Sequence, residues 1–417
     1  MPKKILSLFI TLLPLFALGQ ATTSPYSILG IGDIETKDFG KFFGMSSATT
    51  AMRSTSFVNI NNAASLTALD PSMLNIDINA RWRSSAYRMA NLDTFTKRYN
   101  DGAFRRFSIT FRPSDKWGLS LGLRPYSSVN YSLQGTMSLG MGETTDIAKS
   151  VSGTGGLNQA YVANGFKLNK NFSVGATASF LFGSIKRSTL YYQSNLGLNL
   201  TRNEYQNLKA FNFGISAQYV GKLGDHFTNT IGFTASVPTK IMGTAEVNYI
   251  ESDSTVTTTY NDNYKPLKLP LEFNLGYALT IDNQFTFSFD YGRKLWDEQK
   301  LSYPNSKIMP TQRAAFGFQY SKQQYMQGQV REKYFFQAGA SYEESYLSIN
   351  GKQLLDISGS VGAGVNVNRL VNVYLGIEVG SRGSKSRGQI TENYTQVGVG
   401  ITLKEFWINT KKLRLYP

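Results

Sequence analysis

The chain has 417 residues, a formal net charge of +15 and a mean hydropathy of −0.24, which is too polar for a bundle of transmembrane helices. Aromatic residues make up 13% of the chain, glycine is abundant and cysteine is absent, so disulfides and a lipid-anchored cysteine are both excluded. Many aromatic residues with moderate overall polarity are typical of an outer-membrane β-barrel. On such a barrel, the positive charge favours contact with outer-membrane lipid and lipopolysaccharide phosphates, and no motif indicates nucleic-acid binding.

Residues 1–19 predict a signal peptide. Lys3 and Lys4 precede an apolar run over residues 5–16, and Ala17 and Gly19 supply the small residues of a cleavage site. The apolar run is too short to span a bilayer comfortably, although a retained anchor helix is the alternative. We therefore expect an exported protein whose mature chain begins near Gln20.

Residues 20–71 predict a hatch, or plug, inside the barrel lumen. This segment mixes small residues with scattered apolar ones and does not alternate as a strand does. A barrel of about fourteen strands leaves a lumen larger than its own side chains fill. The alternatives are a periplasmic extension and a flexible linker. The transmembrane barrel itself is expected over residues 72–417.

The remaining sequence predicts an all-β fold, a transmembrane antiparallel β-barrel. Apolar residues alternate with small polar ones over residues 172–182, 271–279, 285–291 and 371–379, as expected for lipid on one face and lumen on the other. Short turns are expected at residues 113–116, 169–171, 222–228, 282–283, 321–333 and 366–371. Longer polar stretches lie at residues 91–102, 140–156, 186–207, 251–265, 296–312, 344–354 and 381–389. One strand on each flank gives about fourteen strands, with both termini in the periplasm.

Pro125 lies inside the predicted third strand, residues 118–136, and the strand count requires that strand to be continuous. Proline has no N–H for a β-ladder, and a closed barrel offers no edge to accommodate it. The freed carbonyls cannot face hydrocarbon, but the neighbouring Ser127, Ser128 and Asn130 supply polar partners for them. An ordinary β-bulge that adjusts the register is the alternative.

Several motifs resemble the FadL/TodX-like outer-membrane transport proteins, in the branch common among Bacteroidetes-type bacteria. The opening Ser24-Pro25-Tyr26-Ser27 with Gly30-Ile31-Gly32-Asp33 is similar to the start of that branch. Asn61-Asn62-Ala63-Ala64-Ser65-Leu66 resembles the Asn-Pro-Ala hatch motif of the family, with Asn62 in place of the usual proline. The resemblance covers nearly the whole mature chain.

This resemblance implies an outer-membrane channel for passive uptake of hydrophobic, fatty-acid-like molecules. In such a channel the third strand bends inward and opens a lateral gap, through which a molecule enters the outer leaflet. The gap is expected at Arg124, Pro125, Tyr126, Ser127, Ser128 and Asn130.

Substrate contacts are predicted from strand alternation and from the apolar residues of the hatch. A lumen cation such as Arg81 or Arg106 would hold a carboxylate head group. Phe335 and the hatch residues Phe42, Phe43 and Met45 would contact an apolar tail. Pairs that fix the hatch to the wall are the alternative role for lumen charges.

Enzymatic activity is not expected, and neither is a cofactor or a metal. His226, the single histidine, lies in a predicted turn with no nucleophile beside it. The rival to uptake is a non-transporting barrel that docks a protein partner in an outer-membrane secretion or assembly complex, through the polar stretches 186–207 and 251–265. Uptake predicts a continuous apolar path through the lumen, whereas docking predicts a sealed lumen.

Overall fold

The computed structural model describes residues 24–71, 73–88, 96–138, 146–193, 198–251, 254–297, 299–300, 306–326, 329–368 and 370–406. The predicted signal peptide, the expected mature start near Gln20 and the last eleven residues, 407–417, lie outside this part. Within it, no helix has the length and apolar character needed to cross a membrane.

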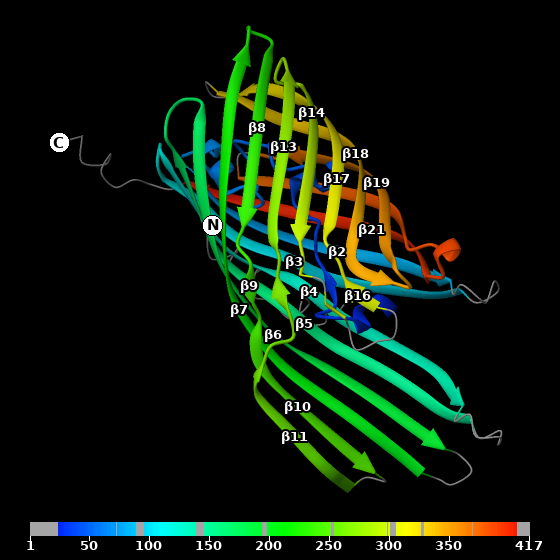
Figure 1. Ribbon diagram of the computed structural model, residues 1–417. Coiled ribbons are helices and arrows are strands. Elements are labelled where there is room, and N and C mark those ends of the chain that lie inside the picture. Colours follow the sequence, from blue (N-terminus) through cyan, green and yellow to red (C-terminus); the bar gives the residue numbers. More distant parts are fainter. Residues whose placement is uncertain are drawn as a thin grey trace.

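Fourteen of the described strands form a closed antiparallel β-barrel, as the sequence predicted (Figure 1). Each of these strands pairs with the next, and β21 returns to β2 along a ladder from Arg88↔Thr391 to Met73↔Phe406. The wall strands are β2 (Met73–Arg88), β3 (Thr96–Ser114), β4 (Trp117–Ser138), β5 (Asp146–Lys167), β6 (Phe172–Gln193), β7 (Leu198–Leu223), β8 (Phe227–Ser236), β13 (Leu271–Ile281), β14 (Phe285–Leu295), β17 (Thr311–Met326), β18 (Gln329–Ile349), β19 (Lys352–Asn366), β20 (Val371–Arg382) and β21 (Thr391–Phe406).

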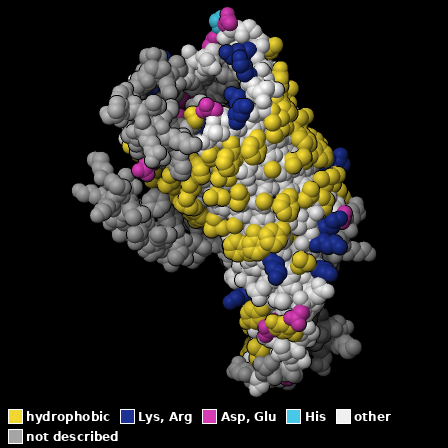
Figure 2. All heavy atoms as spheres, turned by 90° about the vertical axis from the view of Figure 1, so that its left-hand side faces the viewer, with side chains coloured by type: hydrophobic (Ala, Val, Ile, Leu, Met, Phe, Trp, Pro, Cys, Tyr) yellow, Lys and Arg dark blue, Asp and Glu magenta, His cyan; other side chains and the backbone are white. Residues whose placement is uncertain are grey.

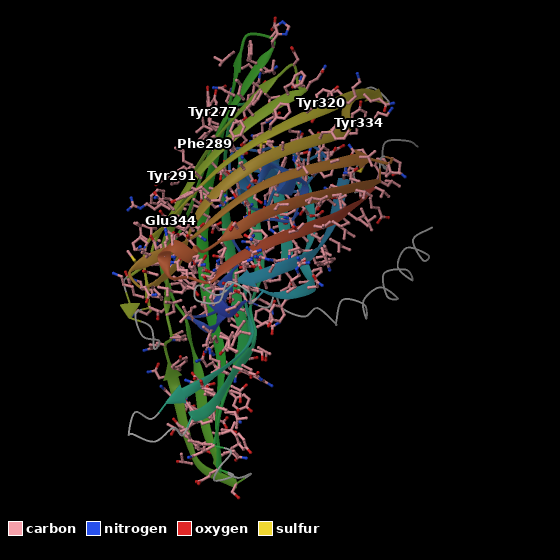
Figure 3. The ribbon with its side chains drawn as sticks, turned by 90° about the vertical axis from the view of Figure 1, so that its right-hand side faces the viewer. Tyr277, Phe289, Tyr291, Tyr320, Tyr334 and Glu344 are labelled. Carbon is pink, nitrogen blue, oxygen red and sulfur yellow. The ribbon has the colours of Figure 1, made fainter. Side chains whose placement is uncertain are left out.

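Apolar side chains form a belt on the outer surface of the barrel, because alternate residues of each strand point outward. On β7, for example, the side chains of Phe211, Phe213 and Ile215 are each more than half exposed. Figure 2 shows the belt as a band of hydrophobic side chains. Figure 3 shows labelled aromatic residues such as Tyr277 and Phe289 on the outer side of β13 and β14. The exposure of these rings is explained by a lipid environment.

Residues 24–71, here called the inner segment, lie inside the barrel. Their elements are η1 (Pro25–Ile28), β1 (Asp33–Ile34), η2 (Lys41–Met45) and η3 (Ala63–Ala68). η2 contacts β17, β18, β19 and β20, whereas η3 contacts β4, β5, β6 and β7, so the segment bridges different parts of the wall (Figure 1, blue). Glycines permit close approach: a Cβ on Gly44 would lie 2.6 Å from Gly362 Cα.

Five stretches that the sequence predicted as long loops are mostly strand where they are described. β3 covers residues 96–102 of the first stretch, and β5 covers residues 146–156 of the second. β6 and β7 extend through residues 186–207, and β11 (Ser254–Tyr264) covers most of residues 251–265. β18 and β19 are joined by a two-residue turn, in which Asn350 and Gly351 have φ of +53° and +75°. The polar composition of these stretches led to the wrong prediction of loops, because strands that extend beyond a membrane have two solvated faces and are therefore polar on both. The smaller elements are β9 (Thr239–Lys240), β10 (Met242–Glu251), β12 (Lys268–Leu269), β15 (Gln299–Lys300), β16 (Ser306–Ile308) and η4 (Lys385–Arg387).

Candidate functional site

The barrel wall divides between β3 and β4. These strands pair only from Ser114↔Trp117 to Phe107↔Leu123. Beyond that point β3 continues along β2 and β4 continues along β5, so two strand edges separate at the level of Pro125. On the β5 side the register shifts between Pro125 and Ser127, which is a β-bulge. The predicted continuous third strand is thus confirmed, and a ladder break and a bulge both occur at its proline.

The inner segment covers the freed edge of β4. β1 pairs with it at Asp33↔Ser128 and Ile34↔Ser127, both of which are buried on the β4 side. Two further backbone bonds flank this pairing: Glu35 N–H donates to the Tyr126 carbonyl and Ser24 N–H to the Asn130 carbonyl, each at 2.9 Å. Carbonyls that β3 no longer satisfies therefore bond to the inner segment instead of facing lipid.

A cavity of about 240 Å³ lies beside the wall break. Arg124, Pro125 and Tyr126 line it, and the Arg124 Nε donates to Gln159 Oε1 at 2.7 Å. The other charged residues of its lining are Glu35, Lys37, Asp38, Arg105, Glu272, Asp290, Lys294, Arg313 and Glu343. Charges of both signs line this space together with apolar residues such as Ile34, Phe39 and Leu269, which makes it a chamber of mixed polarity.

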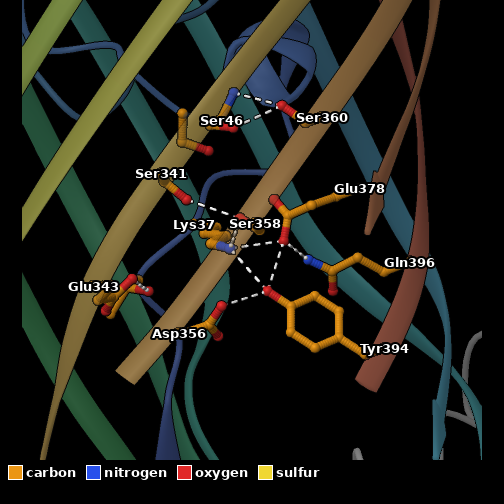
Figure 4. Close-up of polar contacts among 12 residues, drawn as sticks. Lys37, Ser46, Ser341, Glu343, Asp356, Ser358, Ser360, Glu378, Tyr394 and Gln396 are labelled. Atoms are coloured by element: carbon orange, nitrogen blue, oxygen red, sulfur yellow. Dashed lines mark hydrogen bonds and ion pairs between the residues drawn. The ribbon is translucent and has the colours of Figure 1, made fainter. Parts of the chain in front are cut away.

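Buried ion pairs fasten the inner segment to the wall. Lys37 Nζ lies 2.7 Å from Glu378 Oε1 on β20, and both side chains are less than one-tenth exposed (Figure 4). Tyr394 and Gln396 also bond to the Glu378 carboxylate, at 3.1 and 2.9 Å. A second contact uses Asp290, whose Oδ2 accepts the backbone N–H groups of residues 49 and 50. These contacts hold the segment in one arrangement.

The residues predicted to bind substrate take part in packing and ion pairing. Phe42, Phe43 and Met45 are buried in η2. Phe335 is buried and packs edge to face on a ring of the inner segment at 5.7 Å.

The two predicted cations are likewise engaged. Arg106 pairs with Asp38 of the inner segment and with Asp77 of β2, and Arg81 pairs with Asp101 at 2.8 Å. Of the six predicted substrate residues, Arg81 alone lines either of the two described cavities, namely the smaller one of about 100 Å³.

The predicted hatch motif forms η3 and is internally bonded. Asn62 is the N-cap: its Oδ1 accepts the Ala64 N–H at 3.1 Å, and its Nδ2 donates to the Thr50 carbonyl at 2.8 Å. Ser65 Oγ donates to the Asn59 carbonyl, and Asn61, Ala63 and Leu66 complete the motif. Asparagine therefore provides a cap and a crosslink where the resemblance led us to expect proline.

An apolar cluster fills the long-loop end of the lumen. It joins the inner segment (Tyr26, Leu29 and Ile31) to Trp296 and Tyr346 of the opposite side. The Trp296 and Tyr346 rings stack at 5.1 Å. At the short-turn end, His226 Nδ1 lies 2.5 Å from Asp282 Oδ1 on the surface, which joins two turns, as expected for turn chemistry.

A six-stranded sheet continues beyond the barrel at the long-loop end. It consists of the distal parts of β4, β5, β6 and β7 together with β10 and β11, and is here called the projecting sheet (Figure 1, lower part). β10 takes the place of β8 beside β7, from Met242↔Lys209 to Glu251↔Leu200. Near its base, burial raises the pKa of Tyr264, and Glu204 adds to this effect. Sequence reasoning missed this sheet because it took residues 251–265 for a loop.

Comparisons place this architecture among known outer-membrane barrels. The chain is similar in structure to a Pseudomonas aeruginosa FadL homologue, with a TM-score of 0.59 and 11% identity over 94% of this chain and 100% of that chain. It is also similar to the Pseudomonas putida toluene transporter TodX, with a TM-score of 0.57 and 15% identity over 91% of this chain and 100% of that chain. A third similar structure is the CymD monoaromatic hydrocarbon channel, with a TM-score of 0.56 and 13% identity over 88% of this chain and 97% of that chain. At these identities the likeness shows the fold alone.

The sequence itself matches a different family name. No curated protein matches the sequence of this chain. The family model described as BamG matches residues 1–414. The predicted resemblance therefore holds for the fold of the FadL and TodX channels, whereas the Bacteroidetes-type branch stays a prediction. Because the matching model covers nearly the whole sequence, the chain belongs to the BamG family.

Proposed function

We propose that this barrel is a docking subunit, which holds a partner protein at the outer membrane as part of a secretion or assembly complex. The observation that carries the proposal is the projecting sheet, which extends beyond the barrel and whose β10–β11 hairpin contacts the rest of the described chain mainly through β7. A large ordered sheet costs conformational entropy and contributes little to closing a barrel. Its exposed edge and faces are the kind of surface that a protein partner covers.

The lumen supports the same proposal. Uptake of an apolar molecule requires a continuous apolar path, but ion pairs such as Arg105–Glu35 and Lys294–Glu272 interrupt the apolar lining of the described cavity at the wall break. Moving the inner segment aside would break several buried ion pairs, and each such break costs about 3–5 kcal/mol. The apolar side chains at the long-loop end pack on one another. A lumen in which the inner segment is ion-paired to the wall suits a barrel that serves as an anchor.

The direct test is the size of the complex in the native membrane. The tagged full chain is extracted in a mild detergent and its particle mass is measured by mass photometry, with crosslinking before extraction as a second measurement. We expect a stoichiometric complex with an outer-membrane or surface protein. A variant in which residues 242–264 are replaced by a short Gly-Ser turn, with its barrel folding checked by heat-modifiable mobility, is expected to lose that complex. A monomer in both measurements would refute docking.

Passive uptake of a hydrophobic small molecule or lipid is the second candidate, because the wall break at Pro125 opens beside the cavity. Such a molecule would leave sideways through the gap between β3 and β4, after the β1 pairing to Ser127 and Ser128 had opened. Vesicles that contain the purified chain are loaded with an apolar fluorescent probe from outside, and TodX serves as the positive control. Uptake that exceeds protein-free vesicles, and that falls when β1 is tethered to β4 by a disulfide between Ile34→Cys and Ser127→Cys, would favour this candidate.

The roles of residues 1–19 and of the inner segment are the next part of the proposal. We infer that residues 1–19 are removed on export and that the inner segment acts as the hatch, since its elements contact two separate parts of the described wall, β4–β7 and β17–β20. The first described residue, Ser24, bonds to Asn130 toward the long-loop end, whereas Phe406 lies beside Met73 near the start of β2. A periplasmic position for both termini stays a prediction, and it is testable by protease protection of terminal tags.

A further inference from the structure

Within the part of the chain that the structure describes, β11 is an edge strand with no neighbour on its outer side. Among the described residues it pairs with β10 alone, from Gly243↔Tyr264 to Glu251↔Ser254. Its central run, residues 257–261, pairs with residues 245–249 without a register shift, and a bulge lies on each side of that run. All five residues of the run, Thr-Thr-Thr-Tyr-Asn, are exposed. A five-residue stretch of regular strand, in which alternate residues direct unpaired backbone donors and acceptors outward, is thus presented to solvent at the far edge of the projecting sheet.

The composition of this edge is unusual for a strand that is to remain unpaired. Exposed edges are ordinarily protected by lysine, proline or covering segments, because a free edge is a template for strand addition. The run has neither lysine nor proline, and its threonines and tyrosine favour extended backbone. On the opposite edge of the same sheet, β1 of this chain pairs with β4 at Ser127 and Ser128, and Ser24 bonds to Asn130. The chain therefore supplies a partner to the β4 edge at the base of the sheet, whereas no described segment pairs with the outer side of β11.

The negative charge around β11 indicates the charge of a partner segment that could pair with this strand. From Met242 to Tyr264 the sequence contains Glu246, Glu251, Asp253 and Asp262, and no lysine or arginine, on a chain whose formal net charge is +15. Tyr260 is 61% exposed and stands opposite Glu246, and Asp262 follows it two residues along the exposed edge. An aromatic face beside carboxylates is a favourable environment for a cationic side chain. The hairpin is thus an acidic surface on a basic protein.

We propose that β11 binds an extended, basic segment of a partner protein, which adds to the projecting sheet as an antiparallel seventh strand. Main-chain hydrogen bonds to residues 257–261 supply affinity, and Lys or Arg side chains beside Tyr260 and Asp262 supply specificity, as in β-strand addition. The inference deepens the proposed docking function and rests on it: it names the edge that docks and the chemistry of the segment that is bound.

The test uses purified full-length chain in detergent and three fluorescent eleven-residue peptides. The first alternates Lys with Thr and Val, the second is identical except for a central proline, and the third carries Glu in place of Lys. Binding is measured by fluorescence anisotropy, and amide hydrogen exchange reports which residues become protected. We expect the first peptide to bind at least about tenfold more tightly than the second, because proline cannot donate to the ladder. We also expect slower exchange at residues 257–261.

Point substitutions distinguish β-strand addition at β11 from nonspecific electrostatic attraction of the basic peptide. Asp262→Lys is expected to weaken binding of the basic peptide at least about tenfold, through like-charge repulsion across the added pair. Asp262→Asn, a milder change at the same site, is expected to weaken binding less, and Asp225→Asn, the same charge change in an exposed turn, is expected to leave it unchanged. Equal binding of the proline peptide, protection elsewhere than β11, or wild-type affinity in Asp262→Lys would each overturn the proposal.

Failure of this inference differs from failure of the proposed function. If the native complex persists at full stoichiometry in Asp262→Lys, docking holds and the β11 edge is excluded as its site. If wild-type chain forms no complex in the membrane, the docking function fails, whatever the peptides do.

Discussion

The Lys37–Glu378 pair offers the sharpest test of how firmly the inner segment is held. Replacing Lys37 by Met removes the ammonium but leaves Glu378 fully buried, with Gln396 as its remaining donor and a Tyr394 O–H that it shares with the nearer Asp356. Loss of one partner of a buried pair costs about 3–5 kcal/mol. Because the hydrogen bond from Gln396 to Glu378 survives, we expect a value near the lower limit, about 3 kcal/mol. This corresponds to an increase on the order of a hundredfold in the fraction of molecules with a released inner segment.

The assay exploits the absence of cysteine from the chain. Ala48 of the inner segment is fully buried, so Ala48→Cys provides a single thiol that reacts with a maleimide when the segment leaves the wall. Labelling is expected to accelerate on the order of a hundredfold in Lys37→Met. The exposed Lys170→Met is the matched control and is expected to have no effect.

A double-mutant cycle decides whether the pair itself is responsible. Lys37→Met combined with Glu378→Gln removes both charges, so the double variant is expected to recover about 1–3 kcal/mol relative to the sum of the single changes. The reasoning would be refuted if Lys37→Met changed the labelling rate less than about threefold, or if the two single effects simply added. Either result would mean that the inner segment is held by packing and backbone bonds rather than by this ion pair.

Further predictions concern packing, capping and the proline. Gly44→Ala is expected to lower the free energy of unfolding by about 1–3 kcal/mol in a urea titration, because its Cβ meets β19 backbone, whereas Gly135→Ala, with open space around it, should not. Asn62→Asp keeps the cap of η3 but places a buried carboxylate oxygen against the Thr50 carbonyl, so it should lower the free energy of unfolding by more than Asn62→Ala, which should cost about 2 kcal/mol; a smaller cost for the aspartate variant would contradict this account. Pro125→Ala should change the free energy of unfolding by less than about 1 kcal/mol, because the β3–β4 ladder ends at Leu123, before the proline. A larger gain in stability would show that the proline itself breaks the ladder.

The hairpin between β18 and β19 shows a local signal that sequence reasoning passed over. Asn350-Gly351 is the strongest short-range hairpin signal, since both positions of a type I′ turn require positive φ. It was available in the sequence, but the polar residues around it favoured a long loop. The same bias assigned residues 251–265 to a loop, although a run of threonines in that stretch favours strand.

The sequence by itself determined the fold class, the strand count and the interrupted third strand. These features follow from local physics: a period-2 pattern of apolar residues, turn chemistry at fixed intervals and a proline that lacks an N–H. The tertiary structure alone decided which lumen charges pair, since Lys37 and Glu378 are 341 residues apart in the chain. It also decided that β10 replaces β8 beside β7, which leaves β11 as an open edge. Such contacts depend on the register and closure of the whole barrel, which no local pattern encodes.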